Sequence, residues 1–188
     1  IRNSENIVFN GPGKTEEELK EAINSSIGSI NVDSFSELKR LKDINPNNKV
    51  NLGIRISSDK IKDMRVFGIP VNTKRNIDEI IKNIPRKYVL KMLHVHIGPY
   101  INYRVHLTSV LEKLTSIMLH LSREHGIVIE KLNLGGGVDE NILKKEKDHF
   151  DYFKEFFSVI RDYVEKELIQ TQAQIESLLK EIEKLEKV

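Results

Sequence analysis

Short apolar runs alternate with segments of helical period through the first four-fifths of this 188-residue chain. Runs of this kind, bounded by Gly, Pro, Asn and Ser, are typical of buried strands. Strands are expected at Asn6–Asn10, Ser29–Val32, Val50–Ile56, Val89–Ile97 and Ile127–Leu134. Because each run is followed by a helical pattern, the order indicates βα units that build a parallel sheet.

Helices are expected between and after these strands. Thr15 followed by Glu18 forms an S/T-x-x-E capping box, which predicts the start of the first helix. Further helices are expected at Ser36–Lys42, at Asn76–Ile84, at Asp148–Leu168, and on a long segment whose apolar stripe holds Leu107, Val110, Leu111, Leu114, Ile117, Met118 and Leu121.

The C-terminal twenty residues have a different pattern. Ile175, Leu178, Ile182 and Leu185 follow alternating three- and four-residue steps, which are those of a heptad seam, and Val188 stands three residues further on. Two interpretations stay open: an amphipathic helix that packs over the open side of the sheet, or a helix that associates with another copy. We therefore divide the chain into a barrel-like domain, residues 1–168, and a heptad-patterned helix, residues 169–188.

The number of strand-helix units limits the fold class. A closed (β/α)8 barrel needs eight units and typically about 250 residues, and the sequence supplies about five. We expect an α/β fold, either an open sheet or a partial (β/α)8 TIM-like barrel with about five parallel strands. A fragment of a barrel leaves strand edges unpaired, so the edges should be covered by a helix, by another copy in a homo-oligomer, or by another chain.

Composition excludes several classes of partner. The chain has 30 basic and 28 acidic side chains, a net charge of +2, so nothing favours nucleic acid or an anionic membrane. It contains no cysteine, which excludes disulfides and thiolate chemistry and fits a cytoplasmic protein. No apolar run approaches the ~20 residues that span a bilayer, and the first residues lack the apolar core of a signal peptide.

Chemistry in a parallel α/β fold is expected at the carboxyl ends of the strands. Lys14, Asp33, Arg55, His94 and His96 all lie there. The period of two places both histidines on one side of their strand, where they could share a zinc ion with Asp33, as in a metal-dependent hydrolase. The alternative is that they simply pack at the strand end, and we expect no metal.

Gly135, Gly136 and Gly137 directly follow the strand-like KLNL. Three glycines let the backbone approach an anion closely, and their N–H groups can converge on phosphate oxygens. A flexible turn between strand and helix would have the same sequence. Because His and Arg residues stand at neighbouring strand ends, we favour a site for a phosphorylated cofactor with an aromatic ring.

Several motifs together resemble one family. VFNGPGKTEEEL, INVDSFSELKRL, GIRIS with VFGI, HVHIG and KLNLGGG follow the same order as in the pyridoxal-phosphate-dependent decarboxylases of the alanine racemase-like barrel group. That fold-type III group includes diaminopimelate and ornithine decarboxylases. The resemblance covers about residues 5–140 and implies the central part of the barrel, with pyridoxal phosphate as cofactor and a small amino acid as substrate.

The resemblance also implies roles for particular residues. His96 matches the histidine that stacks on the pyridoxal ring, and Gly135, Gly136 and Gly137 match the loop that binds its phosphate. Arg55 matches an arginine near the cofactor.

Lys14 and Asp33 match positions at the barrel mouth, and His94 is an accompanying strand residue. Lys14 does not match the family's Schiff-base lysine, so no catalytic residue can be assigned. The segment with that lysine, the EPGR strand and the C-terminal β-domain have no counterpart in the sequence. We therefore expect a fragment or degenerate form with negligible activity alone. HVHIG favours the diaminopimelate-type branch, and an interaction protein that uses the C-terminal helix is the alternative function.

Overall fold

The computed structural model describes residues 4–57, 67–96, 103–135 and 149–185. The chain divides into two compact units, which are described separately. One consists of residues 1–100 and 112–138, and the other of residues 101–111 and 139–188. In the described part of the chain, no helix combines the length and apolar character needed to cross a membrane.

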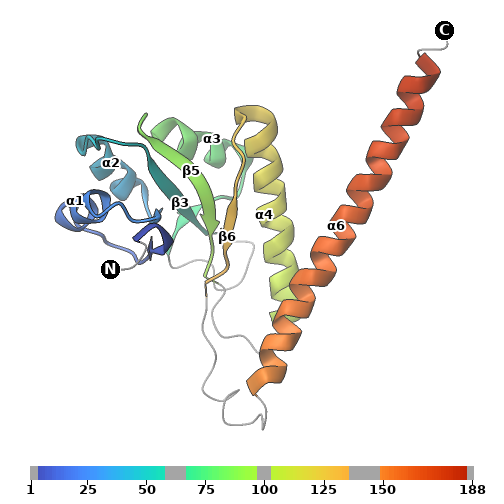
Figure 1. The fold of residues 1–188 in the computed structure, drawn as a ribbon, viewed down its shortest axis with the longest axis horizontal. Helices are drawn as coiled ribbons and strands as arrows, with labels where there is room; N and C mark the ends of the chain where they lie inside the picture. The colour runs from blue at the N-terminus through green and yellow to red at the C-terminus, as the bar shows by residue number, and fades with distance from the viewer. Residues whose placement is uncertain (1–3, 58–66, 97–102, 136–148, 186–188) are drawn as a thin grey trace. The chain divides into compact units, whose positions relative to one another are not determined.

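The first unit contains a parallel sheet whose strands follow one another in chain order (Figure 1). A short 3-10 helix, η1 (Ser4–Asn6), precedes it. The main path is β1-β2-β3-β5-β6, and every pair along it is parallel. The strands are β1 (Val8–Phe9), β2 (Ser29–Val32), β3 (Val50–Ser57), β4 (Ile69–Pro70, paired with the end of β3), β5 (Tyr88–His94) and β6 (Lys131–Asn133). This arrangement confirms the predicted α/β class with a partial barrel of about five parallel strands.

Helices alternate with the strands, as the sequence pattern predicted. They are α1 (Glu16–Asn24), α2 (Phe35–Asp43), α3 (Lys74–Asn83) and α4 (Tyr103–His125). The capping box of α1 is formed: Glu18 N–H donates to Thr15 Oγ1 at 3.2 Å, and Thr15 N–H donates to the Glu18 carboxylate at 2.8 Å. These bonds satisfy two N–H groups that would otherwise lack partners at the helix start.

The core of this unit lies between the central strands and the helices that cover one face. Ile54 and Ile56 of β3 and Leu90 and Leu93 of β5 line an apolar layer with residues of α3 and α4, namely Ile77, Ile80, Ile81, Ile117 and Leu121. Full burial of one such side chain contributes about 1.5–3 kcal/mol. This layer fixes the register of β3 against β5, and thereby the relative position of the strand ends.

The fifth strand is shorter than the run Ile127–Leu134 predicted. Gly126 ends α4 in the left-handed conformation, φ +63°, and its N–H donates to the Ser122 carbonyl at 3.1 Å. The next N–H, of Ile127, also donates back into α4, to Leu121 at 3.1 Å. The first apolar residue of the run therefore belongs to the helix cap, and pairing with β5 begins only at Lys131.

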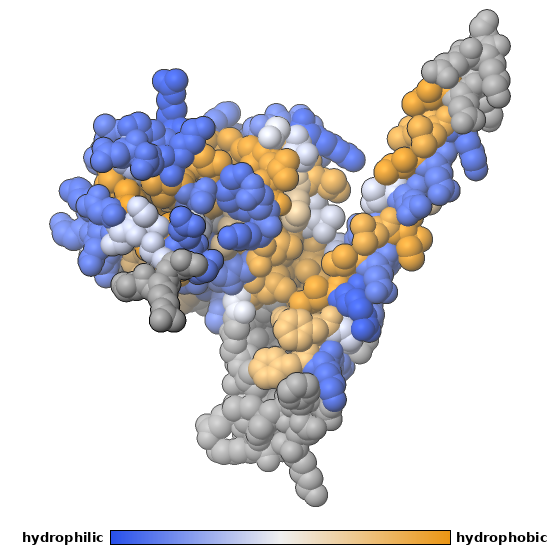
Figure 2. All heavy atoms as spheres, in the orientation of Figure 1, coloured by the Kyte–Doolittle hydropathy of each residue, from blue (hydrophilic) through white to orange (hydrophobic). Residues whose placement is uncertain are grey.

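The second unit is dominated by α6, which runs from His149 to Leu185. It is continuous across the expected boundary between residues 168 and 169, and that boundary stays a prediction. Hydrophobic side chains follow its visible face (Figure 2). Several are exposed, among them Phe157, Val164, Leu168, Ile175, Leu178 and Ile182.

Candidate functional site

The carboxyl ends of the strands form one polar edge of the sheet. Arg55 of β3 is in register with His94 of β5, which is in register with Asn133 of β6. Val32, the last residue of β2, pairs with Ile54, so Asp33 follows directly beside Arg55. The structure thus brings together the strand-end residues that the sequence singled out, in a row across four strands. We call this row, with the adjoining Lys14, Glu37, His96 and Gly135, the polar edge.

The Lys14 side chain is buried and forms an ion pair with the buried carboxylate of Glu37. Its ammonium lies 3.1 Å from Glu37 Oε2, and its backbone N–H donates to Glu37 Oε1 at 3.0 Å. The two side chains are only 2% and 1% exposed. Glu37 also accepts the Asp33 N–H at 2.8 Å, so one carboxylate ties the loop after β1 to the end of β2. Lys14 is therefore a structural residue of this edge and is not presented to a ligand.

Asp33 and Arg55 form a second ion pair, which is partly buried. Arg55 Nη1 donates to Asp33 Oδ1 at 2.9 Å, and the Gly68 N–H donates to Oδ2 at 3.2 Å. The guanidinium also lies over the Phe67 ring, 5.2 Å from its centroid. Both carboxylate oxygens of Asp33 are thus engaged, which disfavours the hypothesis that Asp33 completes a zinc site with His94 and His96.

His94 lies at the centre of the row and is buried. Burial lowers the pKa of its imidazole below the ordinary value of 6.5, while a hydrogen bond with Asn133 opposes the shift and the positive charge of Arg55 adds to it. The ring is therefore neutral at physiological pH. Its Nδ1 is buried and has no hydrogen-bond partner among the described residues.

His96 and Gly135 lie against each other at the ends of β5 and β6. Gly135 has φ +72°, and its N–H donates to Asn133 Oδ1 at 3.0 Å. A Cβ at Gly135 would lie 2.8 Å from His96 Nδ1 and 2.8 Å from the Val95 carbonyl oxygen. Glycine is thus required here both for its conformation and for the space it leaves. His96 itself is exposed.

These residues fit a cofactor with an aromatic ring and a phosphate. His96 offers an exposed imidazole at a strand end, and the Cβ-free backbone of Gly135 sits directly beside it. Asn133 holds the start of the glycine loop through the Gly135 N–H. Gly136 and Gly137 lie outside the described residues, so their part in a phosphate loop stays a prediction.

Two members of the edge were missed from the sequence. Glu37 stands three residues after Ser34, at the expected start of a helix rather than at a strand end. Ser34 does accept the Glu37 N–H at 3.3 Å, but the Glu37 carboxylate turns to Asp33 and Lys14 instead. Asn133 was part of the quoted KLNLGGG, and its place two residues before Gly135 was the available signal.

Comparison with known proteins identifies the family. The family model described as "pyridoxal-dependent decarboxylase, pyridoxal binding domain" matches residues 2–178. The chain belongs to this family. Its cofactor is pyridoxal phosphate, in agreement with the resemblance that the motifs carried and with the strand-end geometry above.

Individual relatives support the same assignment. The chain is 28% identical over 178 residues to diaminopimelate decarboxylase of Haemophilus influenzae, a match that covers 87% of this chain and 42% of that protein. It is 32% identical over 150 residues to the diaminopimelate decarboxylase of Methanocaldococcus jannaschii, covering 72% of this chain and 34% of the relative. A crystal structure of the latter enzyme superposes with a TM-score of 0.63 at 28% identity, over 77% of this chain and 36% of that one. The chain thus spans less than half the length of these relatives.

Proposed function

We propose that the polar edge binds pyridoxal phosphate as part of an amino-acid decarboxylase of the diaminopimelate type. The observation that carries the proposal is the contact between Gly135 and His96, in which a left-handed glycine leaves no room for a Cβ beside an exposed imidazole. The relatives named above, which are diaminopimelate decarboxylases, support the substrate class. The same proposal places the protein in the cytoplasm, which the absence of cysteine from the sequence supports.

Each residue of the edge has a distinct part in this proposal. His96 stacks on the pyridoxal ring, and Gly135, whose N–H is held by Asn133, begins the glycine loop of residues 135–137 that receives the phosphate. Arg55, held by Asp33, places a fixed positive charge beside the site and helps to keep His94 neutral. When bound, the pyridoxal ring supplies the electron sink for loss of carbon dioxide from an amino acid.

Lys14 does not form the covalent link to the cofactor in this proposal, because its ammonium is buried against Glu37. The Schiff-base lysine then comes from a segment other than the strand ends described here, in this polypeptide or in a completing chain. The described residues are accordingly a cofactor cradle, and we expect negligible decarboxylation from the 188-residue chain on its own.

Cofactor titration tests the cradle. The affinity for pyridoxal phosphate is measured by calorimetry for the 188-residue chain, for His96→Ala and for His125→Ala, a control histidine at the C-terminal end of α4. Loss of ring stacking should weaken binding about 2- to 12-fold in His96→Ala, because such contacts are worth about 0.5–1.5 kcal/mol. Equal affinities in His96→Ala and the wild type would contradict the proposal.

Borohydride reduction followed by mass spectrometry tests the role of Lys14 separately. We expect no adduct at Lys14 when the chain is mixed with pyridoxal phosphate and reduced. An adduct at Lys14, together with turnover of a diamino acid, would show that the buried ion pair opens and that Lys14 is catalytic.

The exposed stripe of α6 favours a second function, self-association. From Phe157 to Ile182 the helix follows alternating four- and three-residue steps, at which Val164, Leu168, Ile175 and Leu178 are also exposed. Arg161 and Thr171 occupy the two polar steps. The seam is therefore longer than the two heptads visible in the last twenty residues and reaches the ~3–4 heptads expected of a coiled coil.

Neighbouring residues on α6 provide a matched test of this seam. Leu168 lies on it and Ile169 does not, although the two are 63% and 70% exposed. In sedimentation velocity, Leu168→Lys should shift a dimer toward monomer, and Ile169→Lys should leave the distribution unchanged. A wild-type chain that sediments as a monomer at all concentrations would remove self-association as a function of α6.

A further inference from the structure

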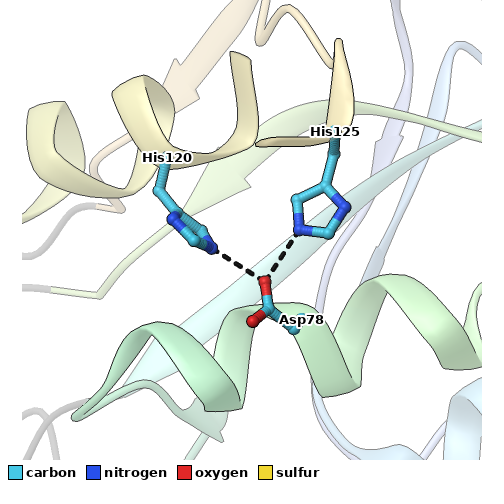
Figure 3. Close-up of side chains that lie close together, drawn as sticks. All are labelled: Asp78, His120 and His125. Carbon is cyan, nitrogen blue, oxygen red and sulfur yellow. Dashed lines mark hydrogen bonds and ion pairs between the residues drawn. The ribbon is translucent and has the colours of Figure 1, made fainter. Parts of the chain in front are cut away.

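A second cluster of polar side chains lies away from the polar edge, where α3 and α4 face each other (Figure 3). His120 Nε2 and His125 Nε2 each lie 2.8 Å from the same oxygen of Asp78, Oδ1. The potential ligand atoms of the three residues all lie within 4.8 Å of one another, and no other group of this kind occurs among the described residues. All three residues belong to the first compact unit.

The cluster is partly open to solvent. The His120 side chain is 7% exposed, that of His125 22% and that of Asp78 35%. Both imidazoles converge on a single oxygen of the Asp78 carboxylate. Two imidazoles and one carboxylate, with access for water from the Asp78 side, form the donor set of a three-ligand zinc site with a fourth, open position.

The geometry points to a divalent transition-metal site formed by Asp78, His120 and His125, a site separate from the proposed cofactor cradle. Metal–ligand bonds of about 2.0–2.1 Å in a tetrahedron place ligand atoms about 3.3 Å apart. The nitrogen-to-oxygen distances here are 2.8 Å, so each must open by only about half an ångström to admit the ion. Nitrogen donors select zinc, cobalt or nickel over magnesium and calcium.

Each imidazole donates its Nε2–H to the Asp78 carboxylate oxygen, which can only accept. For a metal to bind through Nε2, the proton must therefore move from Nε2 to Nδ1 of the same ring. His120 Nδ1 is buried without a partner among the described residues, so its N–H would lack an outer acceptor. Because such acceptors are worth about 10- to 100-fold in metal affinity, we expect weaker binding than at a zinc site with a complete outer shell.

The position of the cluster in the fold indicates a structural role for a bound metal. His125 is the last residue of α4, which leads to the amino end of β6, so the cluster lies toward the opposite end of the sheet from the polar edge. A metal here would join α3 to α4. It should therefore raise thermal stability by binding the native state and should leave affinity for pyridoxal phosphate unchanged.

Cobalt provides the test, because tetrahedral coordination gives it a visible spectrum. The 188-residue chain is titrated with Co²⁺ alone, with Mg²⁺ as the negative control, and its melting temperature is followed in parallel. We expect one Co²⁺ per chain and affinity lower by about tenfold or more in His125→Gln. His106→Gln on the same helix, and the double variant His94→Gln/His96→Gln, should bind as the wild type does.

Asp78→Asn separates a metal site from a purely hydrogen-bonded cluster. Asparagine keeps an acceptor oxygen for both imidazoles but removes the charge that a metal needs. A metal site predicts weaker Co²⁺ binding with a nearly unchanged melting temperature in the metal-free protein. Absence of Co²⁺ binding to the wild type, or an affinity in Asp78→Asn and His125→Gln equal to that of the wild type, would overturn the proposal.

Discussion

The polar edge has two halves that differ in how their polar groups are satisfied. At the ends of β1, β2 and β3, charge is matched by charge: Glu37 holds Lys14, and Asp33 holds Arg55. At the ends of β5 and β6, His94 is buried with Nδ1 unpartnered among the described residues, and His96 is exposed beside a glycine that admits no side chain.

The difference indicates a division of labour along one row of strand ends. Ion pairs whose carboxylates also accept backbone N–H groups fix the strand ends relative to one another, as Glu37 and Asp33 do here. A half with an exposed ring and an unpartnered buried nitrogen, next to a glycine loop, is arranged for a partner that is not part of the chain. The first half therefore supports the fold and holds the charge of Arg55 in place, and the second half is where the ring and phosphate of the cofactor are expected.

Removal of Glu37 should have the largest effect on stability. Glu37→Leu would leave the Lys14 ammonium buried without its carboxylate and the Asp33 N–H without its acceptor. Loss of one partner of a buried pair typically costs about 3–5 kcal/mol, which urea unfolding would measure. Lys14→Met combined with Glu37→Leu should recover part of the loss, because no charge is then left unpaired.

A surface pair is the control for this prediction. Glu16 and Lys20 are also ion-paired, at 2.6 Å, but both side chains are exposed. Glu16→Ala should change stability far less than Glu37→Leu, since solvent screens the charges. Similar losses in the two variants would mean that Glu37 does not support the first half of the edge.

The fold was predictable from the sequence because the spacing of apolar residues within each segment distinguishes a strand from a helix. Apolar runs such as Val50–Ile56 and the stripe of α4 need only neighbours along the chain to be recognised. β4 was not predicted, since two residues that include a proline carry no periodic signal. Ile127 was assigned to a strand because the left-handed turn at Gly126 is a property of the backbone, and the sequence pattern did not show it.

The site was predictable only where a residue type stands at a strand end. His94, His96, Arg55 and Gly135 met that condition, and the family resemblance added their roles. Glu37 did not, because a residue in the first turn of a helix reaches the edge only through the packing of α2 on the sheet. The cluster of Asp78 with His120 and His125 was missed for the same reason, because it depends on how α3 lies against α4. In addition, the five-residue spacing of the two histidines does not place their side chains on one face of a helix.

Gly135 offers a test of the second half, with an intermediate effect. In Gly135→Ala the left-handed conformation should cost about 1–2 kcal/mol, and the forced shift of His96 or the Val95 carbonyl about 1–3 kcal/mol more. Gly126→Ala is the matched control, because Gly126 has φ +63° but open space where its Cβ would lie. The difference between the two variants in urea unfolding measures the contacts with His96 and the Val95 carbonyl. Equal losses would show that Gly135 is needed for its conformation alone and would weaken the argument for a cofactor cradle.

Substitution of His94 should have the smallest effect on stability. The direction in which that effect changes with pH distinguishes the two halves of the polar edge. Because burial lowers its pKa, the native imidazole releases its proton more readily than the unfolded one does. Below about pH 6.5 the unfolded chain therefore binds more protons than the native protein, and stability falls as the pH decreases. His94→Gln should reduce this acid destabilisation relative to the wild type, in melting temperatures compared at about pH 7.5 and pH 5.5. His106→Gln serves as the control.

If His94 instead had a carboxylate partner, as the charged residues of the first half do, its pKa would rise and its contribution to stability would grow on acidification. A greater acid sensitivity in His94→Gln than in the wild type would therefore place His94 with the ion-paired half and contradict the division between the two.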